Sequence, residues 1–158
     1  MSIDFLRNVM AGLTVLFMAV LAYVTAWLII DVRWFIDLRG VIVEDSVVGE
    51  DPAILVSRDI NQDFSGAYYV TIREQPSNSI ACTTGRVPLN YEAATQPIEE
   101  QTLSWWAHGG SCTDVLEDRL PAGIYTMETC HEVVSPLRPP KRRCVQSGPF
   151  YVREADGA

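Results

Sequence analysis

The decisive stretch for the fold is LPAGIYTMETCHEVVSPLRPPKRRCVQSGPFYVR, residues 120–153. It holds two runs in which apolar and polar residues alternate, which is typical of β-strands. The proline-rich residues 135–142 interrupt the two runs, and Pro disfavours continuation of a strand. We therefore predict a hairpin centred near Leu137, with the two runs as its strands.

The approach to this hairpin carries a resemblance. Leu120-Pro-Ala-Gly-Ile-Tyr125 resembles the entry to strand F of immunoglobulin-like and fibronectin-III-like sandwiches, where a corner Tyr bonds back to nearby backbone. The resemblance implies that Tyr125 is the corner residue. Cys130 lies five residues after this Tyr, whereas antibody-type domains have a spacing of two. The resemblance implies an architecture and no activity.

The pattern extends upstream of the hairpin. All nine Pro and nine of the ten Gly follow residue 39, which argues against a helical bundle. We expect an all-β, antiparallel, immunoglobulin-like sandwich of about seven strands. The stretch 90–101 is left open as a short helix. The predicted strands are 41–48, 53–58, 67–74, 79–84, 102–107, 123–134 and 143–153.

The four cysteines suggest disulfides. Their spacings of 30, 18 and 14 residues lack the close pairs typical of zinc sites, so we expect no metal and no cofactor. The predicted hairpin places Cys130 opposite Cys144 and leaves Cys82 for Cys112, although sequence alone allows three pairings. Disulfides imply an oxidising compartment. Reduced core thiols are the alternative.

Residues 8–30, NVMAGLTVLFMAVLAYVTAWLII, contain no Asp, Glu, Lys or Arg. A helix of 23 residues spans about 35 Å, enough to cross a bilayer. We predict an uncleaved transmembrane helix; a buried core helix and a signal peptide cleaved after Ala26 are the alternatives. The predicted division is a cytoplasmic N-terminus (1–7), this helix, a juxtamembrane helix or linker (31–40), an exported domain (41–154) and a tail (155–158).

The basic residues flanking the apolar segment weakly favour the opposite orientation, but long domains translocate largely regardless of charge. We therefore expect the C-terminal domain on the periplasmic or extracellular side. Small residues at Gly12, Ala19, Ala22 and Ala26 share one helix face, a pattern that allows close packing between membrane helices. The expected partners are the bilayer and other transmembrane helices; small residues without such a role are the alternative.

Arg138, Lys141, Arg142 and Arg143 form a basic loop on a chain of net charge −8. Such a loop suits anionic headgroups or an acidic partner surface; a solvated loop is the alternative. The net charge argues against nucleic acid.

Trp105 and Trp106 would alternate on a strand, which leaves one exposed as a possible contact. The run Asp59-x-Asn61-x-Asp63 matches the start of a calcium loop but lacks its Gly and Glu, and we interpret it as a turn.

These features predict a non-enzymatic interaction or assembly subunit of an envelope complex, bacterial or phage-encoded, with an envelope protein as partner. One alternative is a ligand- or surface-recognition domain that uses Trp106 and the basic loop. The other is a small thiol or hydrolytic enzyme around His108 and Cys112.

Overall fold

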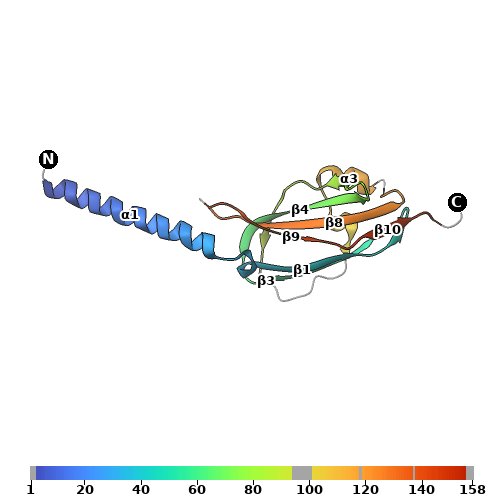
Figure 1. Cartoon of the computed structure of the whole chain (residues 1–158), viewed down its shortest axis with the longest axis horizontal. Coiled ribbons are helices and arrows are strands. Elements are labelled where there is room, and N and C mark those ends of the chain that lie inside the picture. Colours follow the sequence, from blue (N-terminus) through green and yellow to red (C-terminus); the bar gives the residue numbers. More distant parts are fainter. Residues whose placement is uncertain (1–2, 94–100, 118, 137, 156–158) are drawn as a thin grey trace. The chain divides into compact units, whose positions relative to one another are not determined.

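The computed structural model of the chain describes residues 3–93, 101–117, 119–136 and 138–155. The chain divides into two compact units, Met1–Asp31 and Val32–Ala158, and each is described by itself (Figure 1).

The first unit contains one helix, α1 (Ile3–Ile29). Its segment Phe5–Ile29 is long and apolar enough to cross a membrane. The hydroxyls of Thr14 and Thr25 each donate to the backbone carbonyl four residues earlier, at 2.9 and 2.8 Å, so neither polar group is left unsatisfied on an apolar helix. The helix is therefore a candidate membrane span, and signal sequences share these properties.

The second unit is mostly β. In chain order, its described elements are η1 (Val32–Trp34), β1 (Ile36–Val43), β2 (Ser46–Val47), β3 (Ala53–Ile60), β4 (Phe64–Gln75), β5 (Ser79–Thr83), β6 (Val87–Tyr91), β7 (Gln101–Thr102), α2 (Leu103–Trp106), α3 (Gly110–Glu117), β8 (Gly123–Val133), β9 (Lys141–Gln146) and β10 (Phe150–Arg153).

These strands form two sheets. The smaller sheet has the order β1-β3-β7 and is antiparallel. The larger sheet is built on the antiparallel pair β4 and β8. β5 and β6 flank β4, and β9 and β10 flank β8. β2 joins β10 in parallel, so this sheet is mixed and not purely antiparallel as expected. The immunoglobulin-like topology stays a prediction.

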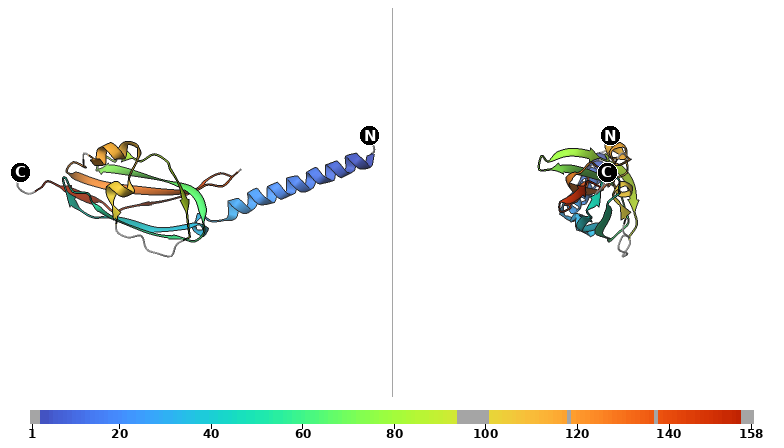
Figure 2. Two further views of the ribbon diagram at one scale, coloured as in Figure 1. Left: turned by 180° about the vertical axis from the view of Figure 1, so that it is seen from behind. Right: turned by 90° about the vertical axis from the view of Figure 1, so that its right-hand side faces the viewer.

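One hydrophobic core draws on both sheets and on the short helices. In β4, Val70 and Ile72 are fully buried while Thr71 and Arg73 are partly exposed, which is the period of two expected of a strand with one buried face. Met127 of β8 and Phe150 of β10 complete this layer. Figure 2 shows the β1–β3 layer and the β4–β8 layer from two further directions.

Two predictions for the start of the domain are wrong. Residues 31–40 do not form a juxtamembrane helix: a 3₁₀ turn at Val32–Trp34 leads directly into β1. Ile36 and Leu38 are buried while Asp37 and Arg39 are more exposed, so the alternation of a strand governs this segment. The predicted strand 41–48 is divided between β1 and β2.

The predicted strand 102–107 is also wrong. Residues 101–102 form β7, and Leu103–Trp106 form the helix α2. The helix α3 and the strand β6 were not predicted at all, and the predicted strand 143–153 is divided between β9 and β10. Of the stretch left open as a helix, residues 94–100 lie outside the described residues.

The cysteine pairing agrees with the expected one. Cys130 lies opposite Cys144 in the β8–β9 register and is bonded to it, and Cys82 of β5 is bonded to Cys112 of α3. The Tyr125 hydroxyl donates to the carbonyl of Pro121 at 3.0 Å, so Tyr125 makes the corner bond that the resemblance implied.

Candidate binding groove beside two short helices

The helix α2 begins at a side-chain cap. Thr102 has an extended backbone, and its hydroxyl accepts a hydrogen bond from the Trp105 backbone N at 3.4 Å, which satisfies a free N–H of the first turn. Leu103 and Trp106, three residues apart, are both buried. Ser104 and Trp105 therefore lie on the outer side of this single turn.

The helix α3 is fixed to the edge strand β5. Gly110 has φ +57°, and a Cβ atom there would lie 2.4 Å from the Thr83 carbonyl oxygen, so this close approach requires Gly. The Ser111 hydroxyl accepts from the Thr83 N at 3.0 Å and donates to the Thr83 carbonyl at 3.2 Å. The Cys82–Cys112 disulfide lies next to these bonds and joins α3 covalently to the sheet.

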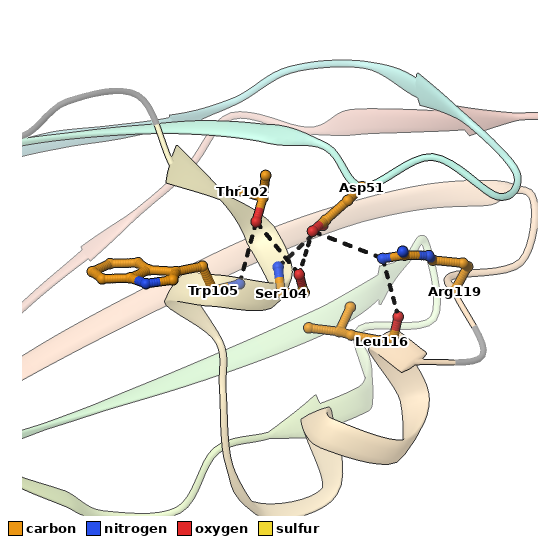
Figure 3. Close-up of polar contacts among 6 residues, drawn as sticks. All are labelled: Asp51, Thr102, Ser104, Trp105, Leu116 and Arg119. Carbon is orange, nitrogen blue, oxygen red and sulfur yellow. Dashed lines mark hydrogen bonds and ion pairs between the residues drawn. The ribbon is translucent and has the colours of Figure 1, made fainter.

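A carboxylate joins the two helical segments (Figure 3). Asp51, on the connection between β2 and β3, accepts from the Ser104 backbone N at 3.1 Å and from the Ser104 hydroxyl. The Arg119 guanidinium, just after α3, lies 3.7 Å from the same carboxylate. The Asp51 side chain is 17% exposed, so this network is half-buried and positions α2 relative to the end of α3.

An open groove of about 550 Å³ lies over this network. Trp105 is 59% exposed, and in Figure 3 its indole ring points away from the polar network. The groove therefore combines an aromatic face with hydroxyl, imidazole, carboxylate and guanidinium groups. Its lining includes Thr102, Ser104, Trp105, His108, Glu117 and Arg119.

One hypothesis took Trp106 as the exposed contact residue, and the structure contradicts it. Trp106 is 4% exposed, and its indole N–H donates to the Thr129 hydroxyl at 3.4 Å, so it is a core residue and not a contact residue. Trp105 is the exposed one. His108 lies at the groove, whereas the sulfur of Cys112 is bonded to Cys82 and is not a nucleophile in this state.

The predicted basic loop lies on the β8–β9 hairpin, away from the lining of the groove. Arg142 is exposed, and its guanidinium donates to the Tyr69 hydroxyl at 2.6 Å. Lys141 and Arg143 are half-buried on β9, and Arg138 is half-buried in the connection.

The small residues Gly12, Ala19, Ala22 and Ala26 are exposed on α1, and their role in helix packing stays a prediction. The Asp59-x-Asn61-x-Asp63 run spans the β3–β4 turn: Asp59 is paired with Arg39, and Asp63 accepts from the Ala93 N at 2.7 Å, so it is tied into the turn.

Within the described residues, one group of potential metal ligands consists of Glu128, Cys130 and Cys144. Both sulfurs are in the disulfide, so this group offers a single carboxylate and no thiolate.

Sequence reasoning missed a buried cluster between the sheets. His131 of β8 is 0% exposed, and its Nδ1 lies 2.7 Å from the Tyr91 hydroxyl of β6. The Arg58 guanidinium of β3 lies over the rings of Tyr91 and Trp106, at 5.8 and 5.2 Å from their centroids. Burial, and to a smaller extent the charge of Arg58, lowers the pKa of His131 to about 3, so this imidazole is neutral at physiological pH.

This cluster combines residues from separate strands, and no local motif signals it. Burial also raises the pKa of the Tyr91 hydroxyl, which keeps it in the protonated form that hydrogen-bonds His131. His131 and Tyr91 are buried and Arg58 is half-buried, so we assign the cluster to the stability of the domain.

Comparison of the chain with family models, with curated proteins and with solved structures returned no match.

Proposed function

We propose that the chain is a single-pass, membrane-anchored interaction or assembly subunit of an envelope complex, bacterial or phage-encoded, without catalytic activity. In this proposal α1 is an uncleaved anchor, the N-terminus is cytoplasmic and the disulfide-bonded domain lies on the periplasmic or extracellular side. The observation that carries it is the presentation of Trp105 at an open groove on a cross-linked domain joined to an apolar helix.

The compartment is argued from the cysteines. All four are in disulfides, and such bonds persist in oxidising compartments. The domain begins at Val32, three residues after the last residue of α1. A domain so close to an anchoring helix is displayed at the membrane surface, where other envelope proteins are within reach.

The groove suits a macromolecular partner better than a small substrate. It is open, and an exposed Trp beside hydrogen-bonding groups is the kind of residue that carries binding energy at protein interfaces. The hydroxyl of Ser104 is bonded to Asp51, and the sulfur of Cys112 is bonded to Cys82. The disulfide removes Cys112 as a thiol nucleophile, and Asp51 also holds the Ser104 backbone N and lies 3.7 Å from the Arg119 guanidinium. Both groups therefore have structural roles at the groove, which supports recognition over covalent catalysis.

A photo-crosslinking experiment in the native membrane tests this proposal. A benzophenone amino acid replaces Trp105, and in a matched control it replaces Tyr151, which is 43% exposed on β10. We expect one discrete protein adduct from position 105 and none from position 151. An excess of the wild-type chain should compete the adduct away, whereas an excess of a Trp105→Ala chain should compete less well because it lacks the aromatic side chain. Equal, diffuse crosslinking from both positions would contradict a partner at the groove.

Thiol alkylation before and after reduction tests the compartment and the enzyme alternative together. We expect no labelling of the membrane-extracted chain until it is reduced, and an intact mass that includes the N-terminal segment. Labelling of Cys112 without reduction would place the domain in a reducing compartment and favour thiol chemistry. A mass that begins at Trp27 would make the protein a secreted domain.

A further inference from the structure

The groove beside α2 and α3 offers negative charge to a ligand. At pH 7 the formal charges in its lining are those of Glu117 and Arg119. The Arg119 guanidinium lies 3.7 Å from the Asp51 carboxylate and donates to the Leu116 carbonyl at 3.5 Å, so its charge is already compensated. Glu117 is exposed in the last turn of α3 and makes no ion pair within the described residues.

The segment that forms the groove has the same sign of charge. Residues 102–119 contain no Lys, three carboxylates and one Arg, which are Asp114, Glu117, Asp118 and Arg119. Asp114 is exposed and precedes Glu117 by three positions on α3, so the two carboxylates lie on one side of the helix. A surface of one charge sign attracts ligands of the opposite sign and repels those of its own. The groove is therefore complementary to a cationic ligand.

The exposed indole of Trp105 is the second feature that suits a cation. Its ring is 59% exposed and stands clear of the polar network in Figure 3, and its centroid lies 6.0 Å from that of the buried Trp106. The face of an indole attracts cations more strongly than other aromatic side chains do, and the planar guanidinium of Arg stacks on it. The fold already contains one such contact, since the guanidinium carbon of Arg58 lies 5.2 Å from the Trp106 centroid.

We infer that the groove binds a basic, arginine-containing segment of the partner protein, with one guanidinium stacked on Trp105 and a neighbouring cation paired with Glu117. This inference rests on the proposed interaction role and adds the chemistry of the partner. Arg suits both positions better than Lys because its guanidinium stacks on a ring and donates two parallel hydrogen bonds to a carboxylate. An acidic segment would be repelled by α3, and an uncharged one would leave Glu117 unpaired.

An NMR titration of the full chain in zwitterionic micelles tests this inference without knowledge of the partner. The probe is a blocked hexapeptide of alternating Gly and Arg, and the readouts are the Trp105 indole N–H and the His108 amide. We expect a saturable shift with this peptide and weaker binding by its Lys analogue. The citrulline analogue, which keeps the shape of Arg without its charge, and the Glu analogue should give no saturable shift. About 0.5 M KCl should weaken binding because it shortens the Debye length to about 4 Å.

Three variants, compared at the His108 amide, separate the ring, the local charge and the net charge. Trp105→Leu keeps an apolar side chain without a π face and should lower the affinity for the Arg peptide about tenfold. Glu117→Gln removes the unpaired carboxylate and should lower it about threefold. Glu154→Gln is the matched control, because it removes one exposed carboxylate beyond β10 and outside the lining of the groove. It should leave the affinity unchanged.

The partner captured from native membranes gives an independent readout. Digestion of the adduct from the probe at position 105 should locate it in a segment that contains Arg. An adduct on an acidic or uncharged segment would overturn this inference and leave the proposed interaction role intact, whereas the lack of a discrete adduct would overturn both. Equal binding of the Arg and citrulline peptides would also refute recognition of charge. An equal loss of affinity in Glu117→Gln and Glu154→Gln would show diffuse attraction without a site at the groove.

Discussion

The buried imidazole of His131 should make the stability of the domain depend on pH. Its folded pKa is about 3, lowered by burial and then by Arg58, and its unfolded pKa is about 6.5. The folded state therefore favours the neutral imidazole. The associated stability is fully present above the unfolded pKa and is lost as the pH falls from about 6.5 towards 3.

The magnitude follows from the two pKa values. Between about pH 7.5 and pH 5 the unfolded chain takes up most of one proton at this position and the folded chain takes up almost none. The free energy of unfolding should fall by about 2 kcal/mol from this residue alone, and by roughly 5 kcal/mol once the pH is below 3. The His131 Nε2 has no hydrogen-bond partner within the described residues, so a proton there finds no acceptor.

The assay is urea unfolding of the full chain in detergent, followed by tryptophan fluorescence at about pH 7.5 and pH 5. Trp106 reports on the cluster because its ring centroid lies 6.2 Å from that of His131. His131→Asn keeps a polar side chain that can bond Tyr91 but does not titrate. We expect the variant to lose about 2 kcal/mol less than the wild-type chain over this pH interval.

Tyr91→Phe serves as the matched control. It removes the hydroxyl that bonds His131 but leaves the imidazole buried, so the pH dependence should persist while stability falls by about 1 kcal/mol at both pH values. Carboxylates elsewhere titrate equally in all three chains, and the comparison cancels their effect. Equal pH dependence in the wild-type chain and His131→Asn would refute the argument.

Three further variants test the contacts that hold the domain together. Replacing Cys130 and Cys144 together by Ala opens a loop with a sequence separation of 14. The free energy of unfolding in urea should fall by about 3 kcal/mol, because the unfolded chain gains conformational freedom. An unchanged urea midpoint would contradict this account. Asp51→Ala removes the acceptor for the Ser104 N and should lower the free energy of unfolding by about 1–2 kcal/mol. It should also weaken crosslinking from the probe at position 105. Unchanged crosslinking would show that Asp51 is not needed to position residue 105. Tyr125→Phe deletes the hydrogen bond to the Pro121 carbonyl and should lower the free energy of unfolding, measured by thermal denaturation, by about 1 kcal/mol. An unchanged stability would contradict a structural role for this bond.

Local patterns were enough to predict the elements whose stability is set locally or by one neighbour. The uncharged run of residues 8–30 predicted an apolar helix, and the alternating runs around Cys130 and Cys144 predicted two paired strands in the observed register. The helix needs only its own backbone bonds, and the hairpin needs only a short loop closure. Both are therefore visible in a short window of sequence.

The segment 31–40 carries the sequence pattern of a strand, although we predicted a helix or linker there. Ile36-Asp37-Leu38-Arg39 alternates apolar and charged residues with the period of a strand, and the structure follows that period. The preceding apolar helix suggested continuity, but a helix over these residues would leave Ile36 and Leu38 on different faces. Pairing with β3 buries both on one side.

The pattern of Trp105 and Trp106 in the sequence fits a strand and a helix equally well. Adjacent side chains point in different directions in both, so one buried Trp and one exposed Trp fit either structure. Leu103 and Trp106, at a helical spacing of three, are both buried. The deciding group is Asp51, which lies far away in the sequence, and no local pattern reveals it.

The proposed groove and the proposed oxidising compartment both depend on disulfide formation. The helix α3 has eight residues, and a helix of that length is not stable by itself in water. Its sequence, GSCTDVLE, favours Ser, Thr and Asp over strong helix formers. The Cys82–Cys112 disulfide and the two Ser111 bonds to Thr83 supply the missing stability. In a reducing compartment α3 would lose its covalent attachment to β5, and the groove would lose one wall. The oxidising location is therefore a condition for the proposed binding surface, and reduction of the folded chain before irradiation should abolish the adduct from the probe at position 105.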